Sequence, residues 1–87
     1  MAYSLTFSRR AAGYLRRMDR ASQQRIAVAL RALCDDPYGR GTKPLKDAAG
    51  RRAVRIGGWR LVYLVDEAEA NVHVDLIGPR GDVYRDL

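Results

Sequence analysis

The 87 residues are enough for a single domain, 1–87, with a small hydrophobic core. The hydrophobic fraction of 47% is too high for a disordered protein, and no apolar run approaches the roughly 18 residues that a membrane span needs. Sixteen lysines and arginines against ten acidic residues give a net charge of +6, which indicates a polyanionic partner. A solvated arginine surface is the alternative.

Secretion and metal-binding signals are absent from the sequence. No signal-peptide pattern opens the chain, and the single Cys34 has neither a disulfide partner within the chain nor a second cysteine for a zinc site. We therefore expect a cytoplasmic protein that uses no metal and no other cofactor.

The first 36 residues predict a strand and two helices. Residues 3–8 (YSLTFS) alternate apolar and polar side chains, which is typical of a half-buried strand. Ser8 and Asp19 are candidate N-caps for helices over residues 9–18 and 20–36, and a proline follows the second helix. Because almost nothing separates the two helices, we expect them to form an αα-hairpin.

The remaining residues predict a loop and three strands. Residues 37–50 are rich in turn formers, and strands are expected over 52–56, 59–65 and 71–77, with Gly57-Gly58 joining the first two as a hairpin. The helices are grouped rather than alternating with the strands. The expected fold class is therefore α+β: an N-terminal strand, an αα-hairpin and a three-stranded antiparallel meander, with the helices on one face of a small twisted sheet.

The predicted hairpin places two arginines side by side. With the two glycines as the loop, Arg55 faces Arg60, on the face opposite the apolar side chains of both strands. Like charges directly opposite each other cost some tenths of a kcal/mol up to about 1 kcal/mol. A bound phosphate would relieve this repulsion. Alternatively, both side chains extend into water, or each meets an acid such as Asp75 or Asp82.

Other chemical signals are weaker. His73 is the only histidine and is expected to face solvent or to make a structural hydrogen bond, and Cys34 is expected to pack in the core. Arginine, lysine and tyrosine remain, and that set can cleave RNA. Arginines stabilise a pentavalent phosphate, and a tyrosinate beside cations can take the proton from a 2′-OH.

The segment KPLKDAAGRRAVRIGGWRLVYLVDE and the later VHVDLIGPRGDVY resemble the RelE/ParE superfamily of bacterial toxins. The shared features are a KPLKG-like loop, an R-V-R-x-G-x-[YW]-R-[LV]-x-Y hairpin and a terminal [GH]-x-R-x-x-[VI]-Y. The resemblance implies the toxin of a type II toxin–antitoxin system. In RelE-type members, it implies an mRNA interferase, a metal-independent endoribonuclease that enters the ribosomal A site, cuts mRNA and so inhibits translation.

The resemblance also implies catalytic residues, which by motif are Arg55, Arg60, Arg80 and Tyr84. Arg60 would stabilise charge on the scissile phosphate and Arg80 would aid the leaving group. Tyr84 would act as general base or stack on a base. One departure is that Ala53 stands where the RelE type carries a lysine.

A cluster of basic residues surrounds the expected catalytic set. Residues 37–64 contain seven basic residues and one acid. Four of these are expected to bind RNA: Lys43, Lys46, Arg51 and Arg52.

The implied partners are a cognate acidic, helical antitoxin, mRNA and the ribosome, with operator DNA bound only through the antitoxin complex and no membrane involved. Two alternatives remain: a ParE-type DNA gyrase inhibitor without nuclease activity, and a non-enzymatic nucleic-acid-binding module. The basic and tyrosine set favours the ribonuclease, because ParE-type members generally lack it.

Overall fold

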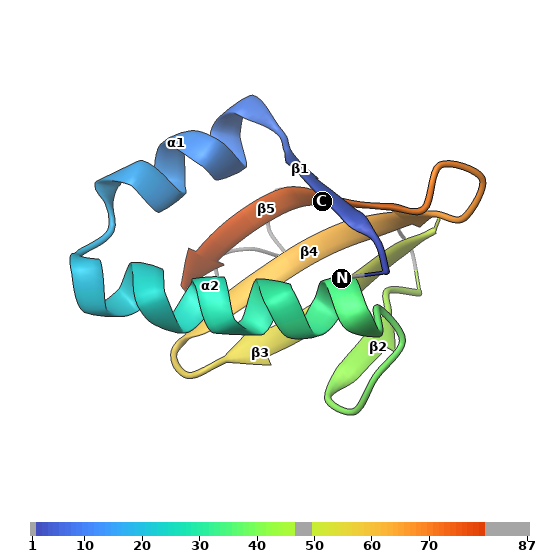
Figure 1. The fold of residues 1–87 in the computed structure, drawn as a ribbon. Helices are drawn as coiled ribbons and strands as arrows, with labels where there is room; N and C mark the ends of the chain where they lie inside the picture. The colour runs from blue at the N-terminus through green and yellow to red at the C-terminus, as the bar shows by residue number, and fades with distance from the viewer. Residues whose placement is uncertain (1, 47–49, 80–87) are drawn as a thin grey trace.

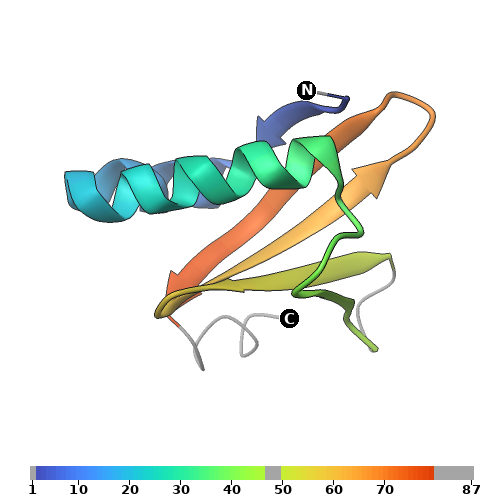
Figure 2. The same ribbon diagram turned by 60° about the horizontal axis from the view of Figure 1, so that its bottom comes forward.

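The computed structural model describes residues 2–46 and 50–79, which form two helices on one face of a five-stranded sheet (Figures 1 and 2). The elements in chain order are β1 (Ser4–Phe7), α1 (Arg9–Arg17), α2 (Arg20–Asp35), β2 (Thr42–Pro44), β3 (Arg51–Ile56), β4 (Trp59–Asp66) and β5 (Asn71–Pro79). The strand order across the sheet is β1-β5-β4-β3-β2, with β1 parallel to β5 and the other neighbours antiparallel. The predicted α+β fold class is confirmed.

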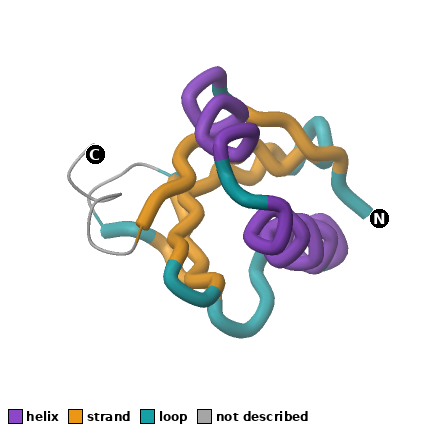
Figure 3. The backbone as a smooth tube through the Cα atoms, turned by 90° about the vertical axis from the view of Figure 1, so that its left-hand side faces the viewer, coloured by secondary structure: helices purple, strands orange, loops and turns teal. Residues whose placement is uncertain are grey.

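Both helices begin where the sequence predicted. The Ser8 hydroxyl accepts a hydrogen bond from the Ala11 amide at 3.1 Å, and an Asp19 carboxylate oxygen accepts one from the Ser22 amide, also at 3.1 Å. These bonds satisfy amides that have no partner within their own helix. Figure 3 looks nearly along α2 and shows both helices on the same side of the sheet.

The hydrophobic core lies between the helices and the sheet. Its largest fully buried side chains are Tyr63, Leu61, Val72 and Val74 from the strands and Ile26 from α2. The Tyr63 hydroxyl donates to the Pro37 carbonyl oxygen at 2.6 Å, so the one polar atom of that side chain is satisfied inside the core. Cys34 is buried as expected, and its burial raises the pKa of the thiol.

A polar network ties the end of α2 to the turn between β4 and β5. Glu67 in that turn accepts a hydrogen bond from the Tyr3 hydroxyl at 2.7 Å and a second one from the Tyr38 hydroxyl. These two bonds favour the charged carboxylate and lower the pKa of Glu67. The bond to Glu67 also raises the pKa of Tyr38 to about 12.

Two features of the sheet differ from the sequence-based expectation. The segment 37–50, predicted as a loop, contains the short strand β2, which pairs with β3 from Thr42 opposite Val54 to Pro44 opposite Arg52. The three residues of β2, Thr42–Pro44, are too few and too polar to show the alternating pattern of a strand. They form one because they can hydrogen-bond to the edge of β3. Strand β5 also extends to Pro79, two residues beyond the predicted end. Within the described residues, neither helix is long and apolar enough to cross a membrane.

Candidate nucleic-acid interface

The β3–β4 hairpin has the register that the sequence predicted. Arg55 lies opposite Arg60, and the two glycines form the turn with Gly57 at a φ of 59°, in the left-handed region. Trp59, which follows the turn, packs edge-on against Tyr14 of α1, with ring centroids 6.0 Å apart. This contact holds the tip of the hairpin to the helical layer and so fixes the place of the arginine pair.

Four basic residues share the face of the sheet that is turned away from the helices. Side chains alternate along each strand, so Arg51 and Arg55 of β3 lie on that face with Arg60 of β4. Lys43 joins them because its partner in the β2–β3 register is Ala53, which lies between the two β3 arginines. We call Lys43, Arg51, Arg55 and Arg60 together the basic face.

The floor of the basic face is apolar. Ala53, Val62 and Leu76 come from three neighbouring strands and form a second buried cluster, against which Leu45 packs. Ala53 is fully buried. The position that carries a lysine in the RelE-like pattern therefore belongs to the packed floor in this chain, and the charges surround it.

Arg52 lies on the other face of the sheet. It pairs with Tyr63 in the β3–β4 register, donates a hydrogen bond to the Thr42 hydroxyl at 2.8 Å, and places its guanidinium carbon 5.1 Å from the centre of the Tyr38 ring. This is a cation–π contact that helps to fix the segment after α2. The structure thus separates Arg52 from the basic face. Lys46 is exposed just after β2.

Two expected catalytic residues, Arg80 and Tyr84, lie outside the described residues. Strand β5 ends beside the β3–β4 hairpin, because Gly78 pairs with Arg60 and Pro79 pairs with Trp59. The last described residue therefore lies beside the arginine pair. The expected convergence of Arg80 with Arg55 and Arg60 stays a prediction.

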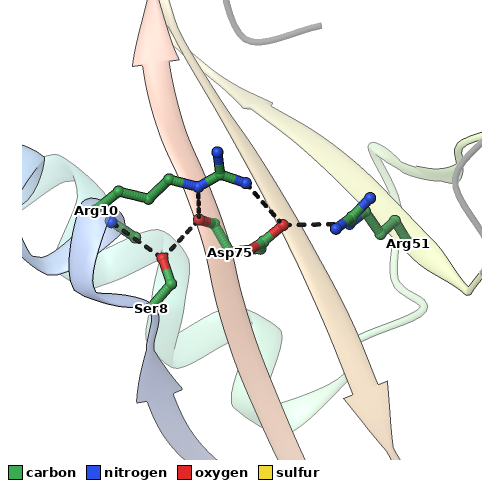
Figure 4. Close-up of polar contacts among 5 residues, drawn as sticks. Ser8, Arg10, Arg51 and Asp75 are labelled. Atoms are coloured by element: carbon green, nitrogen blue, oxygen red, sulfur yellow. Dashed lines mark hydrogen bonds and ion pairs between the residues drawn. The ribbon is translucent and has the colours of Figure 1, made fainter. Parts of the chain in front are cut away.

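Asp75 lies between two arginines from distant parts of the chain (Figure 4). Its Oδ2 is 3.2 Å from Nε of Arg51 and 3.4 Å from Nη2 of Arg10 at the start of α1. Its backbone oxygen accepts hydrogen bonds from the Ser8 hydroxyl at 2.6 Å and from Nε of Arg10 at 3.3 Å. One alternative from the sequence paired Asp75 with a hairpin arginine; its ion-pair partners here are Arg10 and Arg51.

The structure also places the remaining candidate, His73. His73 has its Nδ1 2.8 Å from the Thr6 hydroxyl, which confirms the expected structural hydrogen bond. Arg10 was not identified from the sequence as part of any site. Within the described residues, no three histidine, cysteine or acidic side chains gather in a way that could hold a metal ion.

Comparison with known proteins finds similar toxins. A family model described as the ParE toxin of the type II toxin–antitoxin system parDE matches residues 5–84. A RelE-like toxin protein of Escherichia coli is 33% identical over an alignment of 88 residues. The alignment covers 97% of this chain and 92% of that protein.

Solved structures agree over nearly the whole chain. A chain of the intact E. coli RelBE toxin–antitoxin complex matches with a TM-score of 0.80 at 25% identity, covering 90% of this chain and 96% of that one. A chain of the Mycobacterium tuberculosis RelBE2 complex matches with a TM-score of 0.80 at 26% identity, covering 92% of this chain and 100% of that one. The YoeB/ParE toxin from Agrobacterium tumefaciens, 24% identical with a TM-score of 0.77 over 88% of this chain and 98% of that one, shares the fold.

Proposed function

Because the chain belongs to the RelE/ParE superfamily of type II toxin–antitoxin toxins, we propose that it is a RelE-type endoribonuclease that cuts mRNA on the ribosome. The observation that carries the proposal is the arginine pair on the basic face, where Arg55 lies directly opposite Arg60. Two guanidinium groups that lie opposite each other can share one phosphate, which offsets the repulsion between their charges. A backbone phosphate of RNA supplies that anion.

The proposed chemistry needs no group outside the chain. The 2′-oxygen of the RNA attacks the adjacent phosphorus while the bond to the 5′-oxygen breaks, so the electron pair leaves with the 5′-oxygen. Arg55 and Arg60 stabilise the extra negative charge of the pentavalent transition state. Tyr84, as the tyrosinate, takes the proton from the 2′-OH, and the leaving 5′-oxygen, supported by Arg80, takes up a proton from water. The roles of Tyr84 and Arg80 rest on the family motif.

The second candidate function is inhibition of DNA gyrase. The observation that favours it is that the matching family model is described as the ParE toxin of parDE. A gyrase inhibitor makes no use of an arginine pair around a scissile phosphate, so the two candidates differ in what the hairpin arginines do.

The discriminating experiment induces the protein in bacteria, maps the ends of cellular mRNA and, in parallel, measures supercoiling by purified gyrase. We expect cuts in phase with codons and unaffected supercoiling. Arg60→Ala should reduce cleavage by a factor on the order of a hundred or more, because a guanidinium on a phosphoryl transition state is worth several kcal/mol. Arg20→Ala, at the exposed start of α2, is the matched control for the loss of one charge. Intact mRNA together with inhibited gyrase would refute the nuclease.

Tyr84→Phe separates the two roles proposed for Tyr84. The substitution keeps the aromatic ring and removes only the hydroxyl. If the hydroxyl takes the proton, mRNA cleavage should fall steeply while RNA affinity is retained, and melting temperatures should match those of the unsubstituted protein. Unchanged cleavage would mean that the ring only stacks on a base.

An antitoxin partner follows from the same family. An apolar groove of about 540 Å³ runs between α1, α2 and β1, with Leu15, Phe7 and Leu30 in its wall and Arg16 and Arg31 among its lining residues. An amphipathic helix with acidic flanks would match both the apolar wall and the arginines. Co-expression with a neighbouring acidic antitoxin should relieve toxicity and yield a complex on size exclusion, and persistent toxicity would contradict this partner.

A further inference from the structure

Strand β5 bulges where it carries Asp75. Val62 pairs with Leu76, whereas the next residue, Tyr63, pairs with Val74, so Asp75 has no partner on β4. An extra residue of this kind re-aims its side chain, and bulges occur often beside functional sites. Here the bulge turns the carboxylate across β4 toward Arg51, which lies on β3 and belongs to the basic face.

The carboxylate occupies a position that would suit a phosphate oxygen. A single atom, Oδ2, lies 3.2 Å from Arg51 and 3.4 Å from Arg10, and phosphate oxygens are bound by converging guanidinium groups in the same way. The two arginine side chains are 51% exposed for Arg10 and 33% exposed for Arg51, while that of Asp75 is 15% exposed. Both arginine side chains are thus more exposed than the carboxylate between them, but Nε of Arg51, the atom nearest Oδ2, is itself buried. An anion gains contact with that atom only by taking the place of the carboxylate.

The position along the sheet matches an RNA backbone. Arg51 and Arg55 are four residues apart on β3, which corresponds to about 13 Å along the strand. An RNA strand held by Arg55 and Arg60 and running along β3 toward Arg51 would bring a phosphate further along its backbone to Arg51 and Arg10. The three charges there sum to +1, so the site still attracts an anion while one carboxylate occupies it.

We propose that Arg10 and Arg51 form a second phosphate-binding site, and that Asp75 competes with the RNA backbone for it. The proposal rests on the proposed function, because it assumes RNA on the basic face. In the free protein the carboxylate fills the site, which weakens RNA binding at this end of the face.

The test uses Asp75→Asn, which removes the charge and keeps the shape and the backbone oxygen that Ser8 and Arg10 contact. Affinity for a non-cleavable, 2′-deoxy-substituted oligonucleotide should rise about fivefold at low salt. The dependence of log K on log salt should steepen by about 0.7, the value for one further phosphate on a single strand. Asp35→Asn, at the exposed end of α2, changes the net charge equally and is the matched control.

A double-mutant cycle locates the gain. Arg51→Gln should cost more affinity in the Asp75→Asn background than in the unsubstituted protein, because the site is open only in that background. Equal costs in the two backgrounds would overturn the proposal, as would a gain no larger than that of Asp35→Asn or a loss of affinity on Asp75→Asn.

A measurement without RNA keeps this inference separable from the proposed function. Inorganic phosphate is titrated into ¹⁵N-labelled Asp75→Asn protein while the Nε–H signals of Arg10 and Arg51 are followed by NMR. Both signals should shift, and at lower phosphate concentration than in the unsubstituted protein. Signals that do not move would overturn the second site even if the protein cleaves mRNA. Shifted signals in a protein that cuts no mRNA would support the site and count against the nuclease.

Discussion

Replacing Arg55 with glutamine should make the protein more stable and less active. Directly opposed residues have Cβ atoms about 5 Å apart, and outward-leaning guanidinium groups would then be about 7 Å apart. Two unit charges at that distance repel by roughly 0.6 kcal/mol in water, and screening at 0.1 M ionic strength reduces this to about half. Removing one charge therefore stabilises the fold by about 0.3–0.6 kcal/mol. For a domain of this size, the melting temperature rises by about 1–5 °C.

The stability assay is thermal unfolding at two salt concentrations, paired with mRNA cleavage in induced cells. Arg55 is exposed, so replacing it with the shorter glutamine opens no cavity in the core. We expect the gain in melting temperature to shrink as salt rises, and cleavage to fall by roughly a hundredfold. Arg20→Gln, which removes one charge at the exposed start of α2, should produce neither effect. A destabilised Arg55→Gln protein, or a gain that salt does not change, would refute mutual repulsion.

Three further predictions concern the contacts that hold the sheet in place. Tyr63→Phe leaves the Pro37 carbonyl without its buried donor and should lower the free energy of unfolding by about 1–3 kcal/mol in urea titrations; an unchanged midpoint would contradict this. Glu67 has a pKa below its usual 4.5, so its stabilising effect is present above that pH and is lost as pH falls through the lowered pKa; thermal melts of Glu67→Gln should lack this acid-side loss. Tyr38 has a pKa raised from 10.0 to about 12, so its effect is present below pH 10 and is lost as pH rises toward 12. Tyr38→Phe should reduce that alkaline loss, and the loss that remains belongs to Tyr3, whose own bond to Glu67 also raises its pKa.

The arginine pair could be predicted because it depends only on local rules. A two-residue glycine turn sets which residues face each other, and alternation sets which face they share. The observed pairing of Arg55 with Arg60 follows from these two rules alone. The same alternation separates Arg51 from Arg52, and it was the available signal that only the first of these lies on the basic face.

The Asp75 cluster could not be predicted in the same way. A bulge depends on how two complete strands fit together, and the sequence between Val72 and Ile77 carries no mark of where the extra residue falls. Arg10 is 65 residues from Asp75, and the two meet only because β1 lies parallel to β5 and delivers the start of α1 to that point. Turn type and strand alternation do not determine contacts between distant elements. For this reason the contacts of Asp75 with Arg10 and Arg51 were not predicted from the sequence.

The burial of Ala53 explains why the positive charge is concentrated at the hairpin. A lysine at this position would place its charged side chain among Val62, Leu76 and Leu45, where burial is costly. The small apolar side chain of Ala53 fits there without that cost. The positive charges of β3 on this face therefore lie two residues before and two residues after Ala53, at Arg51 and Arg55. Arg51 faces the Asp75 carboxylate, and Arg55 faces Arg60 beside the point where β5 ends. Because two guanidinium groups can share one phosphate, we propose the hairpin as the cleavage centre.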